Sequence, residues 1–196
     1  MRFVRVAAFF LTILPACFLH GQNFAPGHQS SRDPLSDSET EELRRTADTP
    51  PERVKVFMHF LDERATKISA LKNATLVEHR GLQMHDAIAR FAGLADELQD
   101  NLDEYQDYET SHLRPVPDLR KVLSELETST ATWQSVLSSL PANDDYDFVL
   151  ASANESLKSL KDQTAEMVSV QAKFFAEKKK LAKENQKRTD NGYVLP

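Results

Sequence analysis

Cysteine, glycine and proline are scarce in this chain of 196 residues, and each shortage excludes a class of structure. Cys17 is the only cysteine, so no disulfide can form within the chain. The five glycines are too few and too scattered for a phosphate-binding loop. No proline lies between Pro51 and Pro115, or between Pro141 and Pro196. Stretches of this length without a helix breaker favour long helices over a turn-rich β fold.

Motifs that would commit the chain to a reaction or a cofactor are also lacking. GxSxG, HExxH and CxxCH do not occur. A ferritin-like di-iron site needs two Glu-x-x-His pairs, whereas the run from Glu109 to His112 is the only one. We therefore expect no catalytic residue, no metal site and no cofactor. The histidines are interpreted as solvated surface residues.

The first residues have the composition of a secretory signal peptide. Arg2 and Arg5 form a positive n-region before an uncharged apolar run, VAAFFLTIL at 6–14, that is too short for a comfortable membrane span. Cleavage after Gly21 would make residues 1–21 the signal peptide. Alternatively, LPAC at 14–17 resembles the lipobox of bacterial lipoproteins, in which Cys17 is lipidated, or the segment stays as an anchor. All three interpretations predict export, to the periplasm, the cell envelope or the medium.

Acidic residues outnumber basic ones, 30 to 24, and the two kinds are unevenly distributed. A net charge of −6 predicts no general affinity for nucleic acid or anionic lipid, so membrane contact is expected only through the signal peptide or a lipid anchor. Residues 96–109 hold seven acids and no base, and residues 173–188 hold seven bases and two acids. We interpret the acidic run as a solvated outer face; the alternative is a patch for a weak cation or a basic partner.

Start and stop signals divide the rest of the chain into helices. Residues 22–48 form a polar linker, in which the capping-box form of Ser38 and Glu41 predicts a short acidic helix to about residue 47. Thr49 can cap a helix over about 50–78, and Gly81 suits the left-handed position after it. Further helices are expected over about 82–111, 116–140 and 144–184, followed by a frayed tail at 185–196.

Apolar residues recur in each long helix at alternating spacings of three and four, which is a heptad seam. Four such helices with short connections predict an all-α, antiparallel up-down-up-down four-helix bundle over 49–184, with an extended C-terminal helix. Matching the seams places Thr164 level with Glu109. One layer, with Ala65, Thr130 and Ala153, lacks bulk; it either allows close helix approach or encloses a small cavity. The seams are Val54, Phe57, Leu61, Ala65, Ile68 and Leu71; Met84, Ile88, Phe91, Ala95, Leu98, Leu102 and Tyr105; Val116, Leu119, Leu123, Leu126, Thr130, Trp133, Leu137 and Leu140; and Tyr146, Leu150, Ala153, Leu157, Leu160, Thr164, Met167, Gln171, Phe174, Lys178 and Leu181.

In that register the last helix projects past its partners from about Met167, and the overhang is the candidate interaction surface. It could be covered by the acidic segment before Thr49, which carries Leu35 and Leu43, it could bind a second copy or another protein, or it could fray. The candidate residues are Met167, Val168, Lys173, Phe174, Phe175, Lys178, Lys179, Lys180 and Leu181.

No residue pattern identifies a specific biological role. The preferred interpretation is an exported, non-enzymatic helical-bundle protein with a structural or protein-interaction role in the cell envelope or outside the cell. Its partner would be an unidentified protein or a second copy, bound through the C-terminal helix. The alternative is a small-ligand carrier that uses the bundle core, and an enzyme of unknown class is the third possibility.

Overall fold

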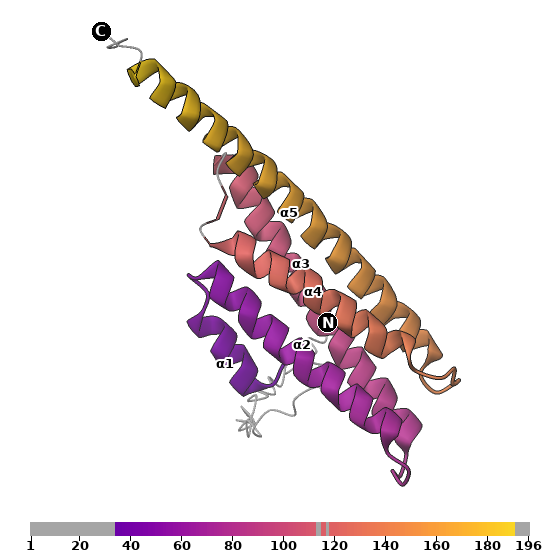
Figure 1. The fold of residues 1–196 in the computed structure, drawn as a ribbon. Helices are drawn as coiled ribbons and strands as arrows, with labels where there is room; N and C mark the ends of the chain where they lie inside the picture. The colour runs from indigo at the N-terminus through magenta and orange to yellow at the C-terminus, as the bar shows by residue number, and fades with distance from the viewer. Residues whose placement is uncertain (1–33, 113–114, 117, 191–196) are drawn as a thin grey trace, which may run out of the picture.

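The computed structural model describes residues 34–112, 115–116 and 118–190, and this part of the chain is all-α (Figure 1). The predicted signal peptide and Cys17 lie outside it. Five helices are present in the described ranges, which contain no strand. They are α1 (Asp37–Arg45), α2 (Pro50–Asn73), α3 (Arg80–His112), α4 (Leu119–Ser138) and α5 (Asp147–Asp190). The last helix therefore continues into the segment for which a frayed tail is predicted.

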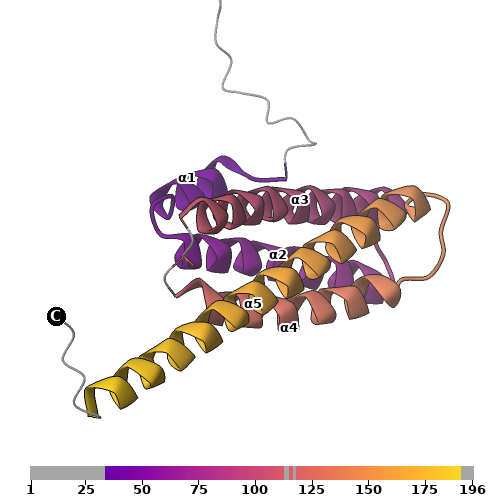
Figure 2. The same cartoon turned by 90° about the horizontal axis from the view of Figure 1, so that it is seen from above.

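The four long helices pack around one core, and their order in space differs from their order in the chain. α2 packs against α3 and α4, and α5 packs against the same two helices, whereas α1 packs against α2 (Figure 2). α3 and α4, although consecutive, face each other across the core, where the rings of Phe91 and Trp133 meet edge to face with centroids 6.0 Å apart. Gln99 on α3 contacts Ser159 on α5, and further along both helices Glu109 contacts Gln171. Residue numbers increase in the same direction on the two helices, so these neighbours are parallel.

The predicted seams form this core. Every seam residue of α2 and α3 is buried, and so are those of α4 and α5 as far as Gln171, except for Leu140 and Leu150, which are partly buried. Two buried threonines satisfy their hydroxyl groups within their own helices: Thr130 donates to the Glu127 carbonyl at 2.9 Å, and Thr164 donates to the Leu160 carbonyl at 2.7 Å. Such back-bonding lets a hydroxyl occupy an apolar layer at little cost.

The predicted register of the last helix is wrong by about one heptad: Thr164 opposite Glu109 is an offset of 55 residues, whereas the α3–α5 side-chain contacts have offsets of 60 to 62 residues. Gln171, not Thr164, lies level with Glu109, because its side-chain amide donates to the Glu109 carboxylate at 2.6 Å. A heptad seam buries its apolar residues equally well in registers one repeat apart, so seam matching cannot distinguish them. At the other end, Gly81 approaches Asp145 so closely that a Cβ at Gly81 would collide with the Asp145 carboxylate.

Three predicted helix ends are also wrong. α2 ends at Asn73, and the left-handed residue before α3 is His79, with φ 51°, while Gly81 lies inside the first turn of α3. α4 begins at Leu119 because Asp118, with φ 58°, interrupts the helix predicted from 116.

The capping box of α1 is formed by Ser36 and Glu39, two residues before the predicted one. Ser36 Oγ accepts from the Glu39 N–H at 3.3 Å, and the Ser36 N–H donates to the Glu39 carboxylate at 2.7 Å. Ser36 and Ser38 both precede an acid by three residues, so the capping-box pattern that predicts Ser38 fits Ser36 equally well. Only the tertiary contact of Glu39 decides between them.

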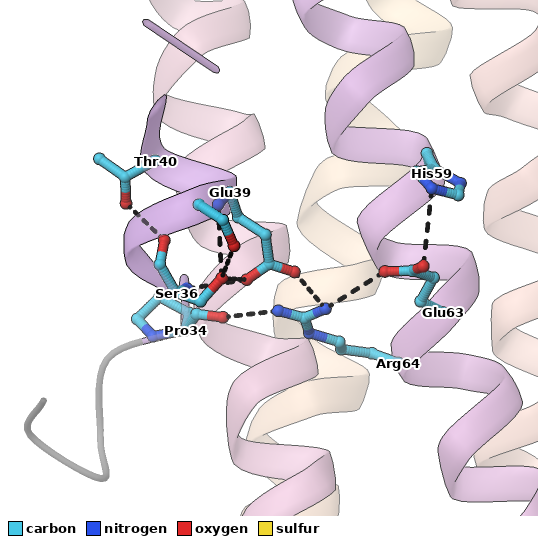
Figure 3. A network of polar contacts seen from close by, with 8 residues as sticks. Pro34, Ser36, Glu39, Thr40, His59, Glu63 and Arg64 are labelled. Atoms are coloured by element: carbon cyan, nitrogen blue, oxygen red, sulfur yellow. Dashed lines mark hydrogen bonds and ion pairs between the residues drawn. The ribbon is translucent and has the colours of Figure 1, made fainter. Parts of the chain in front are cut away.

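α1 lies against α2, so the prediction that its segment covers the C-terminal overhang is wrong. Leu35 and Leu43 are buried in the core. Figure 3 shows the guanidinium of Arg64 on α2 between Pro34 and Glu39: it contacts the Glu39 carboxylate at 2.6 Å and donates to the Pro34 carbonyl at 3.1 Å. Apolar burial, this ion pair and hydrogen bonds from α2 to backbone carbonyls, including one from Arg53 to Leu43 at 2.7 Å, therefore hold α1 in place.

Glu39 is the charged centre of this contact. Burial alone would raise its pKa, but hydrogen bonds from Arg64 and Ser36, together with the charge of Arg64, lower the pKa from 4.5 to about 2. Because the folded pKa lies below the ordinary one, the ionised group stabilises the fold above about pH 4.5. That contribution is lost as the pH falls from about 4.5 towards 2.

We predict that Glu39→Gln lowers the free energy of unfolding at neutral pH, and that the gap between this variant and the wild type closes as the pH falls from about 4.5 towards 2. Denaturant unfolding across this pH range measures the gap. Glu42→Gln is the matched control, since it removes an exposed carboxylate from the same helix, and its gap should be small at every pH. A Glu39→Gln gap that is constant with pH would contradict the ion pair.

We predict that Trp133→Ala destabilises the protein by about 3–5 kcal/mol, because it removes the largest fully buried side chain. Trp133→Phe should cost less: it keeps a ring beside Phe91, although it loses part of the buried ring volume and the indole N–H that donates to Asp62 at 2.7 Å. Denaturant unfolding measures both. A loss below about 1 kcal/mol for the alanine variant would show that the core around α4 is wrongly placed.

Candidate functional site

α5 is longer than the helices that support it, and the unsupported part is the candidate site. α3 ends at His112, level with the turn of α5 that follows Gln171. Residues 175–190, which we call the α5 extension, run on for about 24 Å at 1.5 Å per residue. Figure 2 shows this part of α5 leaving the other helices at a steep angle.

The predicted interaction residues fall into two groups. Met167 is buried, and Val168 and Phe174 are partly buried, so the overhang begins about two turns later than predicted. Phe175 is 40% exposed and Leu181 is 59% exposed. The lysines of the predicted surface are all exposed: Lys173, Lys178, Lys179 and Lys180.

A polar pair anchors α5 just before it leaves the core. Glu109 on α3 is 8% exposed, and one of its carboxylate oxygens accepts from the Val116 N–H at 2.8 Å and from the Gln171 side chain at 2.6 Å. Within the described ranges the other polar atom of the Gln171 amide, Oε1, is buried without a hydrogen-bond partner. From the sequence, Glu109 is half of a Glu-x-x-His run and is predicted to lie level with Thr164, but no buried role is predicted for it. The His112 ring instead bonds the Tyr108 carbonyl at 2.9 Å.

A hollow of about 500 Å³ opens beside this pair, between α3, α5 and the segment that precedes α4. Its apolar wall is formed by Pro115, Met167, Val170 and Phe174, and its polar groups include Glu109 and Gln171. On the other side of α5, the Phe175 ring lies 5.7 Å from the guanidinium of Arg120 on α4. Cation–π attraction of this kind contributes about 0.5–1 kcal/mol at exposed sites, so Phe175 is only lightly held.

Two oppositely charged surfaces flank the point where α5 leaves the core. Four exposed aspartates on α3 are spaced four, three and four residues apart and form one stripe, which we call the acid stripe: Asp96, Asp100, Asp103 and Asp107. The exposed lysines at this end of α5 are Lys173, Lys178, Lys179, Lys180, Lys183 and Lys187. Among the residues described here, none of these ten side chains forms an ion pair.

The described residues contain no group of three or more His, Cys, Asp or Glu side chains that could hold a metal ion. Within the same ranges, every helix is too polar or too short to cross a bilayer. Thr130 and Ala153 are fully buried and Ala65 is nearly so, but the shifted register of α5 means that Ala153 does not share one layer with Thr130 as predicted.

We predict that Gln171→Ala lowers the free energy of unfolding by about 1–3 kcal/mol, because the buried Glu109 carboxylate loses a hydrogen bond. Gln163→Ala is the control. It removes a hydrogen bond from the same helix to Asp103. Because this hydrogen bond is exposed, its loss should lower the free energy of unfolding less. Denaturant unfolding of both variants measures the difference. Equal losses would show that the Glu109–Gln171 pair does not anchor α5.

No protein-family model matches this chain, and no curated protein or solved structure matches it significantly.

Proposed function

We propose that this chain is an exported, non-enzymatic helical-bundle protein that works by contact with another protein, in the cell envelope or outside the cell. The observation that carries the proposal is the α5 extension. About four turns of helix expose Phe175, Leu181 and a set of lysines, and the ring of Phe175 lies against the Arg120 guanidinium of α4.

The architecture suits a rigid support for such a helix. We propose that α2 to α5 form an up-down-up-down four-helix bundle in which the neighbours around the core are α2, α3, α5 and α4. The packing pairs and the burial of the seams support this arrangement. A bundle of this kind holds about the first two thirds of α5, and the last third is displayed in a fixed direction.

The balance of charge favours a protein partner over a membrane or nucleic acid. The lysines of the extension are interleaved with Glu177 and Glu184, and the whole chain is acidic. Exposed apolar side chains beside charged ones are typical of protein interfaces. Export rests on the charged and apolar pattern of residues 1–21, and the lipobox-like sequence keeps lipidation at Cys17 as an alternative to cleavage after Gly21.

A small-ligand carrier is the second candidate, and one observation favours it. The buried Gln171 Oε1 lacks a partner in the described residues and lies at a hollow of about 500 Å³ with an apolar wall. A buried acceptor without a partner is costly, so a ligand that donates a hydrogen bond there would be stabilised. This site lies at the open end of the core, away from the small layer named in the sequence analysis.

We predict that a photo-crosslinker at Leu181 forms discrete protein adducts in cells, whereas the same group at Glu155 does not. Both positions are exposed on α5, but Glu155 lies in the half of the helix that packs on the core. Gel analysis with mass spectrometry identifies the adducts, and the intact mass of the purified protein distinguishes cleavage after Gly21 from lipidation at Cys17.

Three results would count against this function. Absence of adducts at Leu181, together with proteolytic trimming of the intact protein back to about residue 175, would make the extension a tail without a partner. Recovery of the protein with a bound small molecule, lost in Gln171→Ala, would favour the carrier. Recovery in the cytosol with residues 1–21 present would contradict export.

A further inference from the structure

We propose that the partner of the α5 extension is the acid stripe on α3 of a second copy of this chain, in a reciprocal dimer. This inference rests on the proposed function, because it names the partner of the same surface. It starts from two sets of unpaired charges of opposite sign on one molecule, the acid stripe and the lysines of α5.

The extension cannot reach the acid stripe of its own chain. α3 and α5 run in the same direction, and the extension begins where α3 ends. It therefore points away from the acid stripe. The stripe lies beside the earlier half of α5, as the contact of Gln163 with Asp103 shows. Only another molecule can bring these lysines and aspartates together.

The two charged surfaces have matching lengths. Lys173, Lys180 and Lys187 are spaced seven residues apart, so they lie along one face of the helix over about 21 Å. Asp96 and Asp107 are eleven residues apart, which spans about 17 Å. A helix laid along the stripe can therefore contact aspartates over most of its length.

The geometry favours a closed pair over a chain of molecules. The acid stripe occupies the C-terminal half of α3, next to the base of the extension. When two copies meet end to end in opposite directions, each extension overlaps the stripe of the other. The two contacts are then identical, as twofold symmetry requires.

This dimer should be weak and sensitive to salt. Exposed ion pairs contribute little individually and are screened within about 10 Å at 0.1 M salt. The net charge of −6 repels the two copies at long range, so the local lysine–aspartate contacts must outweigh it. Dimerisation should therefore weaken as the ionic strength rises.

A charge-swap experiment tests the proposal on the mature chain. One variant carries Lys173→Glu, Lys180→Glu and Lys187→Glu; the other carries Asp96→Lys, Asp100→Lys and Asp107→Lys. Asp103 is left unchanged because it bonds Gln163. Alone, each variant sets like charges against each other at both contacts, whereas a mixture of the two restores opposite charges at both.

By sedimentation at about 0.02 M salt, we expect the wild type to dimerise and each variant alone to dimerise at least about tenfold more weakly. The mixture should form a one-to-one dimer of the two variants. At about 0.5 M salt the wild-type dimer should dissociate. The matched control is Lys55→Glu, Lys67→Glu and Lys158→Glu, which makes the same change of charge at exposed positions elsewhere and should still dimerise.

A wild type that stays monomeric at low salt would overturn the dimer, and so would dimers that survive both charge reversals. If the crosslinker at Leu181 then still captures a different protein, the proposed function stands and only the identity of the partner is wrong. If it captures nothing, both fail. The wild-type salt dependence requires no variant, and circular dichroism of the variants checks that they are folded.

Discussion

The buried contact between Glu109 and Gln171 determines where α5 leaves the helical core, and the rest of the candidate site depends on it. The seams of α3 and α5 are otherwise largely apolar, and apolar contacts alone would allow more than one register. The buried pair favours the observed register, because a shift by one heptad would break the hydrogen bond between the Gln171 amide and the Glu109 carboxylate. The pair therefore sets both the length of α5 that is supported and the length that is displayed.

The core could be predicted from the sequence because the spacing of apolar residues is a local property. Spacings of three and four identify the buried face of a helix without knowledge of its neighbours. The register could not be predicted in the same way. Thr164 and Gln171 are both polar seam residues, one repeat apart, and either could have matched Glu109. The side chains of Glu109 and Gln171 are both long enough to form a hydrogen bond across a seam. This property could have favoured Gln171 over Thr164 as the residue opposite Glu109.

The errors at the helix ends and at α1 have a different cause. Ser36 and Ser38 are equivalent as caps until Arg64, 25 positions after Glu39, selects Glu39 for its ion pair. The role of Arg64 cannot be recognised from the sequence, because it is one of several charged residues between the seam positions of α2. Likewise, Gly81 has the conformational freedom that a left-handed residue requires, but its lack of a side chain is used instead for the close approach of Asp145. In each case a contact between distant segments overrides a local preference.

The parallel arrangement of α3 and α5 also constrains the order in which the chain can fold. Two parallel neighbours cannot close as a hairpin, and their contacts join residues about 60 positions apart, such as Gln99 and Ser159. By contrast, α2 with α3 and α4 with α5 are each joined by a short turn. Local contacts form sooner than distant ones, because less chain entropy is lost in closing them. The two hairpins are therefore expected to form first and then to dock along the α3–α5 and α2–α4 contacts. Until that docking is complete, the apolar seams of both hairpins are exposed to other chains.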